Sequence, residues 1–511
     1  SLTSPVFARQ KDTQEDKGTV LPGPDRSVLP PPDPTFQGKI GLTLKDSKAD
    51  YQHPLSAPKG APNVLLIVGD DIGYAHMSAF GGPANTPTFD RLAQQGLRFT
   101  NFHTTAICSA SRAALITGRN AHSVGMGATP EVAVGFPGYN ATIPRSKATI
   151  FEILLQNGYA TAWIGKTHVT PIEEITPAGP FEHWPLGLGA EYSYHFFGAG
   201  VSQWYPPVWE NTTPVWPPKT PQEGYILEAD MADKTIAWIE LQKSIDPEKP
   251  WIVHYTPNGH KPPIGVPREF IEKYRRKFDD GYDKLRDRIL ARQKELGIVP
   301  ANTKLAPWPE VLPAWEELTD TDKKVGARWM EVFSGAVEFT DYQIGRIVEA
   351  IEQLGELDNT LIIYLAGDNG PTPEGGLHGI MNKLSYVNGV PESLDDLAKR
   401  IDDFGGPNSA GCNPAAWGYT TSTPFTYGKE VTSGGGNSTA VVISWPARIK
   451  DKGGIRSQFT HLIDVAPTIL EAAGLPEPKR VNGIDQKPME GVSMLYTFDD
   501  AKAEERHTTQ L

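Results

Sequence analysis

The sequence of 511 residues predicts an α/β fold with a large mixed, mostly parallel central sheet flanked by helices. Short apolar runs of strand length recur along the chain, and stretches with helical periodicity separate them. This alternation is typical of βα units wound into one sheet. Helices are expected at 86–96, 149–158, 229–243 and 341–355. We expect a buried parallel strand in each of the apolar runs 63–68, 159–165, 250–255, 359–367 and 439–445.

Charge and hydropathy exclude several classes of function. The formal net charge is -13 at pH 7, whereas binding to nucleic acids or anionic membranes requires a basic surface. A small anionic substrate stays compatible with this charge if a metal ion and a few Lys or Arg side chains make its pocket locally positive. No run of about 18 apolar residues is present, so we expect no membrane span.

The start of the chain and its cysteines bear on the cellular compartment. The chain begins SLTSPVFARQ, without Met or an apolar signal core, which fits a mature chain after cleavage or a trimmed chain. We expect a periplasmic or secreted protein, with a cytoplasmic one as the alternative. Cys108 and Cys412 could form a disulfide in an oxidising compartment, but two cysteines make a poor framework for a chain this long.

The chain divides into an arm, a main domain and a short end segment. Residues 1–60 are rich in Pro, Gly and charge and predict an extended N-terminal arm lying over the main body. Residues 61–490 form the main α/β domain. Within it, 267–322 is predicted to be a helical insertion on the surface. The segment 371–430 is predicted to be a loop region that walls the active site, with a plain surface loop as the alternative.

Polar side chains follow the predicted strands at the point where each strand ends. Singly, each has an ordinary explanation, because an Asp after a strand usually caps a turn or helix and a loop His is usually a surface residue. In an open α/β sheet, however, ligands bind beyond the carboxyl ends of the strands, so together these side chains predict a site there. They are Asp70 and Asp71 after the first run, Lys166 and His168 after the second, His260 after the third, and Asp368 and Asn369 after the fourth.

The acidic members of this set suit a hard divalent cation. Three carboxylates and one amide, from Asp70, Asp71, Asp368 and Asn369, offer the oxygen ligands that Ca²⁺ or Mg²⁺ prefers, whereas zinc would require Cys and His. No Cys/His quartet with zinc spacing is present. An amide in place of a fourth carboxylate lowers the negative charge, which helps if the metal must also hold an anion.

Cys108 stands directly before a predicted helix in the segment ICSASRAALITGRN (107–120). Arg112 follows four residues later and would lie on the same helix face, one turn along. The N-terminus of a helix offers free N–H groups and a positive dipole, so an anion is favoured beside Cys108. A small buried cysteine next to a helix is the alternative explanation.

These motifs resemble those of a known family. CSASRAALITGR is similar to the sulfatase signature, C-x-P/A-x-R followed by T-G-R. NVLLIVGDDIGY resembles the opening strand of that family with its paired metal aspartates, GKTH resembles its G-K-W-H element, and GDNG resembles its second metal motif. HLIDVAPTILEAAGL resembles a late helix. The matches span about residues 60–475 in family order, and the long inserts resemble the bacterial arylsulfatase branch of the alkaline phosphatase superfamily.

The resemblance implies an alkaline phosphatase-like sheet and a formylglycine-dependent arylsulfatase. A maturation enzyme would oxidise Cys108 to formylglycine, whose aldehyde would hydrate. One hydroxyl would attack the sulfur of a small sulfate ester, and the second would then expel sulfate and restore the aldehyde. Asp70, Asp71, Asp368, Asn369 and the modified Cys108 would hold Ca²⁺, with Mg²⁺ as the less favoured ion, and Asp368 would also take the nucleophile's proton.

The resemblance assigns roles to the remaining polar side chains as well. Arg112 would stabilise the hydrated aldehyde, while Lys166 and Lys429 would offset charge on the sulfate oxygens. His168 would accept a proton in the step that eliminates sulfate. His260 and Lys429 would together protonate the leaving oxygen.

The sequence departs from the family pattern at three places, and two other functions stay open. Thr167 replaces the usual Trp of the G-K-W-H element, which changes a pocket wall. Ala110 stands where the signature more often has Pro, so conversion of Cys108 could be incomplete. Residues 491–511 are predicted to begin a small C-terminal antiparallel domain that is largely absent from this chain, through truncation or cleavage, and that a separate chain could supply. The other functions are a phosphodiesterase or phosphonate monoester hydrolase with the same site, and a non-catalytic relative that keeps Cys108 as a thiol.

Overall fold

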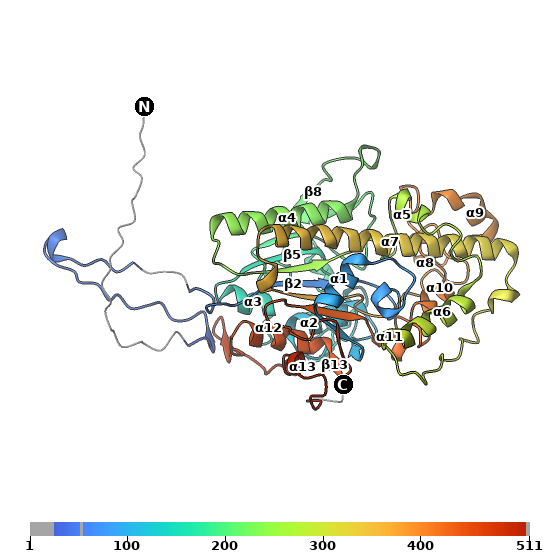
Figure 1. Ribbon diagram of the computed structural model, residues 1–511. Coiled ribbons are helices and arrows are strands. Elements are labelled where there is room, and N and C mark those ends of the chain that lie inside the picture. Colours follow the sequence, from blue (N-terminus) through green and yellow to red (C-terminus); the bar gives the residue numbers. More distant parts are fainter. Residues whose placement is uncertain (1–24, 52–54, 507–511) are drawn as a thin grey trace.

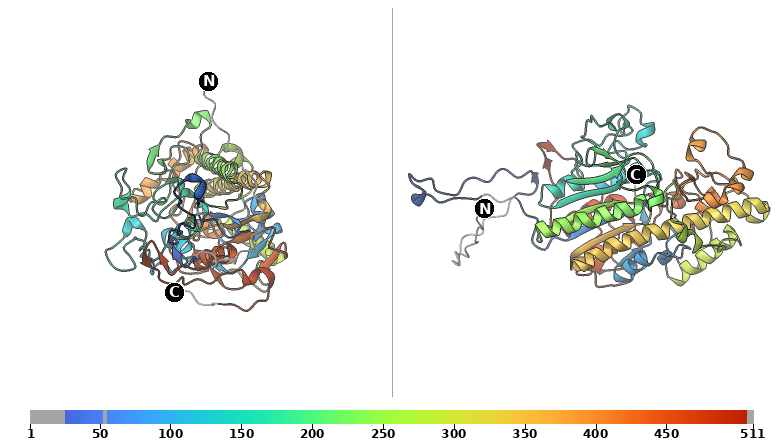
Figure 2. Two further views of the ribbon diagram at one scale, coloured as in Figure 1. Left: turned by 90° about the vertical axis from the view of Figure 1, so that its left-hand side faces the viewer. Right: turned by 90° about the horizontal axis from the view of Figure 1, so that it is seen from above.

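The computed structural model describes residues 25–51 and 55–506. The largest sheet of this part of the chain has ten strands, and two small sheets lie beside it. The large sheet forms the middle layer of the body (Figures 1 and 2). In chain order its strands are β2 (Asn63–Val68), β3 (Leu97–Phe99), β5 (Ala160–Lys166), β6 (Tyr192–Phe196), β7 (Val208–Glu210), β8 (Thr213–Val215), β9 (Trp251–Thr256), β10 (Thr360–Leu365), β11 (Val441–Ser444) and β12 (Gly454–Arg456).

The spatial order of the sheet is β12-β3-β11-β10-β2-β9-β5-β6-β7-β8. Its central strands, from β10 through β2, β9 and β5 to β6, are all parallel. The strands outside them pair antiparallel, except that β12 runs parallel to β3. The predicted mixed, mostly parallel sheet is therefore confirmed, and the carboxyl ends of the parallel strands meet at one edge.

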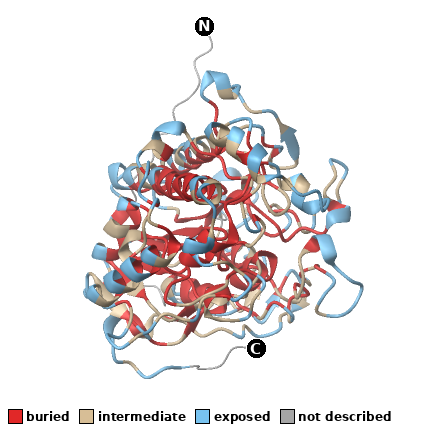
Figure 3. Cartoon of the chain, turned by 90° about the vertical axis from the view of Figure 1, so that its right-hand side faces the viewer, coloured by how far each residue is buried: buried red, intermediate tan, exposed pale blue. Residues whose placement is uncertain are grey.

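Helices cover both faces of the sheet (Figure 1). Leu65 and Ile67 of β2 belong to one apolar core, together with residues of α1 (Pro87–Gln95), α4 (Leu227–Ile245) and α7 (Asp320–Gln353). Leu66 of β2 points the other way, into a second core with residues of α2 (Cys108–Thr117), α3 (Ile150–Leu155) and α12 (Val465–Ala472). Because both faces are covered, the central strands are mostly apolar and form the buried centre of the molecule (Figure 3).

The remaining helices lie at the ends of the sheet and in the long connections. Among the described helices, none is both long enough and apolar enough to cross a membrane. The remaining α-helices are α5 (Arg268–Glu272), α6 (Tyr282–Glu295), α8 (Lys383–Val387), α9 (Leu394–Lys399), α10 (Ala415–Thr420), α11 (Gly434–Asn437) and α13 (Tyr496–Asp499).

One predicted strand direction is wrong. The run at 439–445 was expected to be parallel, but β11 pairs antiparallel with β10, with Val441 opposite Leu365. The long connection after β10 ends at the same edge of the sheet at which it began, so the chain can only run back along its neighbour. An apolar run carries no information about its direction, which is why the sequence pattern did not reveal this.

One helix is much longer than predicted. The sequence indicated a helix at 341–355, whereas α7 begins at Asp320, with Thr319 as its N-cap. The additional turns bury apolar side chains such as Trp329, Val332 and Phe333 against the sheet and the neighbouring connections. Between 267 and 322 the chain forms α5, α6 and the first turn of α7.

The described part of the N-terminal arm projects away from the body instead of lying over it (Figures 1 and 2). At its base β1 (Val28–Leu29) pairs with β14 (Arg480–Val481), and Leu29 is buried there. Beyond the base, Ile40 and Leu44 are almost fully exposed. The predicted arm also includes residues 1–24 and 52–54, and the predicted end segment includes 507–511; these lie outside the described residues.

Candidate active site at the carboxyl edge of the sheet

The predicted site residues gather at the edge where the parallel strands end. Asp70 follows β2, Lys166 ends β5, His260 follows β9 and Asp368 follows β10. These strands are direct neighbours in the sheet, which is why residues nearly 300 positions apart can meet. The helix α2 begins at Cys108 beside this edge, and the side chain of Cys108 is buried.

Cys108 contacts a histidine that is itself held by a carboxylate. The Sγ atom of Cys108 lies 3.1 Å from Nδ1 of His168. The other ring nitrogen, Nε2, lies 3.1 Å from both carboxylate oxygens of Glu131. Burial raises the pKa of the Cys108 thiol, but Lys166, His168 and Lys429 together hold it well below its ordinary value. Position 108 is therefore a place where negative charge is favoured.

Asp70 is the centre of a buried ion-pair network. Its Oδ2 atom lies 2.5 Å from Nζ of Lys166 and 3.2 Å from Nη2 of Arg112. Its Oδ1 atom lies 3.4 Å from Nζ of Lys261. Burial raises the pKa of Asp70, but these cations outweigh it and hold that pKa well below its ordinary value. Asp70 is thus a carboxylate in the folded protein although water does not reach it.

Asp71 forms the second half of the network. It is paired with the ammonium of Lys261, and its Oδ1 atom lies 3.5 Å from Nζ of Lys429. The Nδ2 atom of Asn369 donates a hydrogen bond of 2.7 Å to the same oxygen. Lys429 also lies 3.8 Å from Oε1 of Glu374 in the loop after β10. The predicted Lys429 is therefore in the site, although it lies more than 60 positions after β10.

The arrangement of oxygen atoms fits a divalent cation. Ligand atoms of Asp70, Cys108 and Asp368 all lie within 4.8 Å of one another. The Oδ1 atoms of Asp368 and Asn369 are buried and accept no hydrogen bond from the described residues. Burial and the neighbouring Asp70 raise the pKa of Asp368 to about 7, although Arg112 lies 2.8 Å from its Oδ2 atom. Buried oxygens that lack donors are what a hard cation would satisfy.

His260 has a more specific position than the sequence suggested. Its Nε2 atom accepts a hydrogen bond of 3.1 Å from the backbone N–H of Asp70, and its Nδ1 atom lies 3.4 Å from Oγ1 of Thr340. Burial lowers the pKa of His260 to about 4, so the ring is neutral near pH 7. In this state the ring holds the backbone after β2, and protonation of a leaving group by His260 stays a prediction.

Unusual backbone conformations occur at several site residues. Asp71 and His168 both have φ of 53°, and Tyr427 and Glu430, on either side of Lys429, have φ of 62° and 71°. Residues other than glycine rarely adopt this left-handed region, and such outliers are concentrated at functional sites. Gly69, before Asp70, has a different reason: a Cβ atom there would lie 1.9 Å from the carbonyl oxygen of Ala366. Only glycine lets β2 and β10 approach so closely.

Three site residues were missed by sequence reasoning. Lys261 had a signal, because it directly follows His260 after a strand. Glu374 lies in the loop region that was predicted to wall the site, but nothing in the sequence distinguishes it there. Glu131 lies in a 3₁₀ turn, Pro130–Val132, far from any strand end, so only the folded structure shows that it contacts His168.

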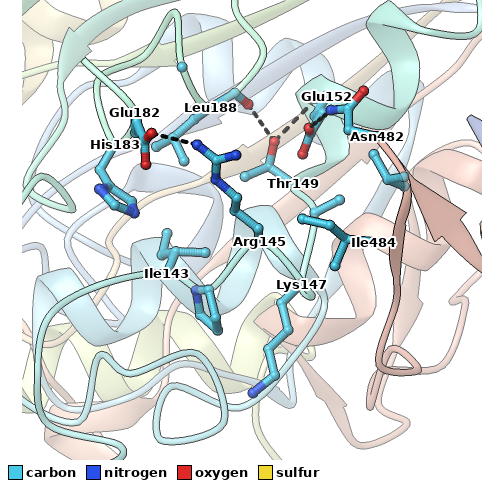
Figure 4. Close-up of a pocket in the computed structure, with 14 residues that line it drawn as sticks. Ile143, Arg145, Lys147, Thr149, Glu152, Glu182, His183, Leu188, Asn482 and Ile484 are labelled. Carbon is cyan, nitrogen blue, oxygen red and sulfur yellow. Dashed lines mark hydrogen bonds and ion pairs between the residues drawn. The ribbon is translucent and has the colours of Figure 1, made fainter. Parts of the chain in front are cut away.

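Two surface cavities lie elsewhere and are not lined by the predicted site residues. One of about 280 Å³ lies beside α3, where Arg145 pairs with Glu182 at 2.5 Å and Asn482 donates a hydrogen bond to Glu152 (Figure 4). Another of about 730 Å³ lies on the side of α2 that carries Ile107 and Ala110.

Both cysteines are free, so no disulfide joins Cys108 to Cys412.

Comparisons with known proteins agree with one another. The family model described as Sulfatase matches residues 62–475. An uncharacterized sulfatase of Schizosaccharomyces pombe is 32% identical over 435 residues, which cover 82% of this chain and 76% of that protein. The arylsulfatase of Klebsiella aerogenes is 29% identical over 451 residues, which cover 86% of this chain and 92% of that protein.

Solved structures show the same fold. The crystal structure of Ps i-CgsB in complex with k-i-k-neocarrahexaose matches with a TM-score of 0.57 at 20% identity. The match covers 86% of this chain and 77% of that chain. At this identity the likeness establishes the architecture, an α/β fold with a large mixed central sheet.

Proposed function

The chain belongs to the sulfatase family and is a sulfuric ester hydrolase, and we propose that it cleaves aryl sulfates through a formylglycine made from Cys108. The observation that carries the proposal is the position of Cys108. Its Sγ atom is grouped with carboxylate oxygens of Asp70 and Asp368 within 4.8 Å and lies 3.1 Å from His168. In this structure the sulfur stands in for a hydroxyl oxygen of the hydrated aldehyde.

The modified residue supplies chemistry that a serine could not. Its hydrate would supply two hydroxyls, one for attack on sulfur and the other for expulsion of sulfate, so no water molecule would have to attack a hindered sulfate ester. The position supports this use, because a helix N-terminus and several cations favour the negative charge of an attacking oxygen. Arg112 lies on the same helix face and forms ion pairs with both Asp368 and Asp70, which keeps the two carboxylates beside position 108.

The chain's own cations match the charge that develops during transfer. Lys166 and Lys429 carry buried ammonium groups, paired with Asp70 and Asp71, and both lower the pKa of residue 108. Such fixed positive groups can stabilise sulfate oxygens without reorganising, and in many enzymes this kind of electrostatic stabilisation contributes most of the rate enhancement. His168 is placed with Nδ1 toward position 108 and would accept the proton of the hydroxyl that expels sulfate.

Ca²⁺ is the cofactor that the site supports best, with Mg²⁺ as the less favoured ion. Asp70, Asp71, Asp368, Asn369 and the modified residue 108 would hold it, and the unsatisfied Oδ1 atoms of Asp368 and Asn369 support this set. The ion would act as a Lewis acid on the nucleophile and on a sulfate oxygen.

The decisive experiment is mass spectrometry of the peptide that contains Cys108, from protein produced together with a formylglycine-generating enzyme. Replacement of the thiol by an aldehyde lowers the peptide mass by about 18 Da. A purely thiol peptide from a fully active preparation would contradict the proposal. Ala110 makes the degree of conversion a quantity to be measured in the same experiment.

Parallel assays with an aryl sulfate and an aryl phosphodiester test the substrate class. We expect the sulfate to be the better substrate by kcat/KM. A preference for the diester greater than about tenfold would favour the phosphodiesterase alternative instead. Periplasmic or secreted localisation, and any separate chain that supplies a C-terminal domain, stay predictions; fractionation of the producing cells tests the first.

A further inference from the structure

Glu131 contacts the site from a loop between α2 and α3, and this loop does not follow a strand of the large sheet. It lies in the 3₁₀ turn Pro130–Val132, after α2, and both of its carboxylate oxygens are 3.1 Å from Nε2 of His168. The His168 side chain is 2% exposed, whereas that of Glu131 is 40% exposed. Glu131 thus connects the buried histidine to the surface, on the ring side opposite Cys108.

We propose that Glu131 is a positioning residue that selects the tautomer of His168 and so leaves Nδ1 free to accept a proton at position 108. The inference rests on the proposed function, because it concerns the proton transfer assigned there to His168. A carboxylate can only accept hydrogen bonds, so Nε2 must carry the hydrogen that it receives. The neutral ring then has its lone pair on Nδ1, which faces Sγ of Cys108 at 3.1 Å.

The surroundings of His168 make this carboxylate necessary. Lys166, at the end of β5, and Lys429, in the loop before β11, act on Cys108 with positive charges. The carboxylates of Asp70 and Asp368 lie within 4.8 Å of its sulfur. A protonated His168 would add a further positive charge to this group. Glu131 supplies an opposite charge in direct contact with the ring, and the contact is strong enough to hold the pKa of Glu131 at about 2 against its burial. Glu131 therefore stays a carboxylate in direct contact with the ring of His168.

The elimination of sulfate moves one proton and two electron pairs. As sulfate leaves, the hydroxyl that remains on the carbon of residue 108 gives its proton to Nδ1 of His168. The electrons of that O–H bond form the carbon–oxygen double bond of the aldehyde, and sulfate departs with the electron pair of the bond that joined it to the carbon. Glu131 exchanges no proton; it stabilises the resulting imidazolium, as the carboxylate partner of a catalytic histidine does.

This order of events predicts a split between kinetic parameters. With an activated aryl sulfate, kcat/KM reports the steps up to release of the phenol, whereas kcat includes the later elimination of sulfate. Glu131→Gln should lower kcat by roughly 10- to 100-fold and change kcat/KM by less than about threefold. The variant should also release a burst of one equivalent of phenol before slow turnover. Equal losses in kcat and kcat/KM, or no loss in kcat, would overturn the inference.

The chain offers a matched control. Glu174 and His183 form another glutamate–histidine pair, with Oε1 of Glu174 2.6 Å from Nδ1 of His183, but this pair does not include a site residue. Glu174→Gln removes the same charge from the same kind of pair and should leave kcat and the burst unchanged. If wild-type protein with converted Cys108 hydrolyses no sulfate ester, the proposed function fails; if the wild type is active and Glu131→Gln behaves like it, only the inference fails.

A second measurement does not depend on the modified residue. In a Cys108→Ser protein labelled with ¹⁵N-histidine, the serine hydroxyl replaces the hydroxyl of the hydrate, and the ¹⁵N shifts of His168 report which ring nitrogen is protonated. We expect hydrogen on Nε2 when Glu131 is present. In Glu131→Gln we expect a mixture, because an amide can donate as well as accept. The same single tautomer in both proteins would overturn the inference.

Discussion

The site around Cys108 and the cavity beside α3 (Figure 4) contain ion pairs of the same length in different surroundings. Lys166 and Asp70 are 2.5 Å apart with both side chains 0% exposed. Arg145 and Glu182 are also 2.5 Å apart, but their side chains are 66% and 55% exposed. The cavity pair is open to solvent, whereas the site pair is one contact of a buried network that also includes Arg112, Asp368 and Asp71.

The surroundings of an ion pair, and not its length, decide how much it contributes to stability. At the surface, water solvates both partners when they separate, so the net stabilisation is close to zero. In the buried site no water replaces a lost partner, so the removal of one charge leaves another unpaired. If the two regions differ in this way, substitutions in the buried site should cost far more activity and stability than a substitution at the cavity.

The largest effect is expected for Asp368→Ala. This change removes a metal ligand and the partner of Arg112 Nε, so both Ca²⁺ binding and turnover should fall below detection. Isothermal titration with Ca²⁺ and an aryl sulfate assay measure the two losses. Asp368→Asn is the matched control, which keeps one oxygen ligand and should bind Ca²⁺ weakly. Activity that persists in Asp368→Ala under chelation would show that the site is misplaced.

Arg112→Ala should reduce kcat/KM by at least roughly 100-fold, a loss of about 3 kcal/mol in transition-state stabilisation. The reason is that Arg112 holds Asp70 and Asp368 together at the reacting position. Steady-state kinetics of the fully converted variant provide the measurement. Arg112→Lys keeps the charge without the two-sided contact and should recover only part of the activity. A loss smaller than tenfold would make Arg112 a structural residue.

Lys166→Met should destabilise the metal-free protein by about 3 kcal/mol, because it leaves Asp70 buried with fewer partners. The loss of unfolding free energy is limited to this size because Arg112 and Lys261 still contact Asp70. Urea unfolding of the unmodified protein, with and without the substitution, gives the difference directly. A change below about 0.5 kcal/mol would mean that the buried pair contributes no more to stability than a surface pair does.

Arg145→Met is the surface counterpart and should have the smallest effect. We expect a change in unfolding free energy below about 0.5 kcal/mol and no change in kcat/KM, because solvent compensates Glu182 for its lost partner. The same urea and kinetic measurements apply. A large loss of activity would indicate that the cavity in Figure 4 communicates with the site.

Much of the site could be predicted because its residues follow the apolar runs that form neighbouring parallel strands. For Asp70, His168, His260 and Asp368, position after a strand was enough, since the sheet brings such ends together. Glu131 and Glu374 could not be predicted, because their loops are placed by tertiary packing and not by a local pattern. The direction of β11 was mispredicted for a related reason: apolar composition specifies burial but not orientation.

The left-handed backbones at Asp71 and His168 have a consequence for variation of this protein. An L-residue in that conformation costs on the order of 1 kcal/mol, and glycine would relieve it. Glycine would nonetheless stabilise neither position, because Asp71→Gly leaves the ammonium groups of Lys261 and Lys429 without this partner and His168→Gly leaves a buried cavity. In an engineering library, both codons should therefore be held constant while the rest of the chain is varied, because their side chains serve the fold as well as turnover.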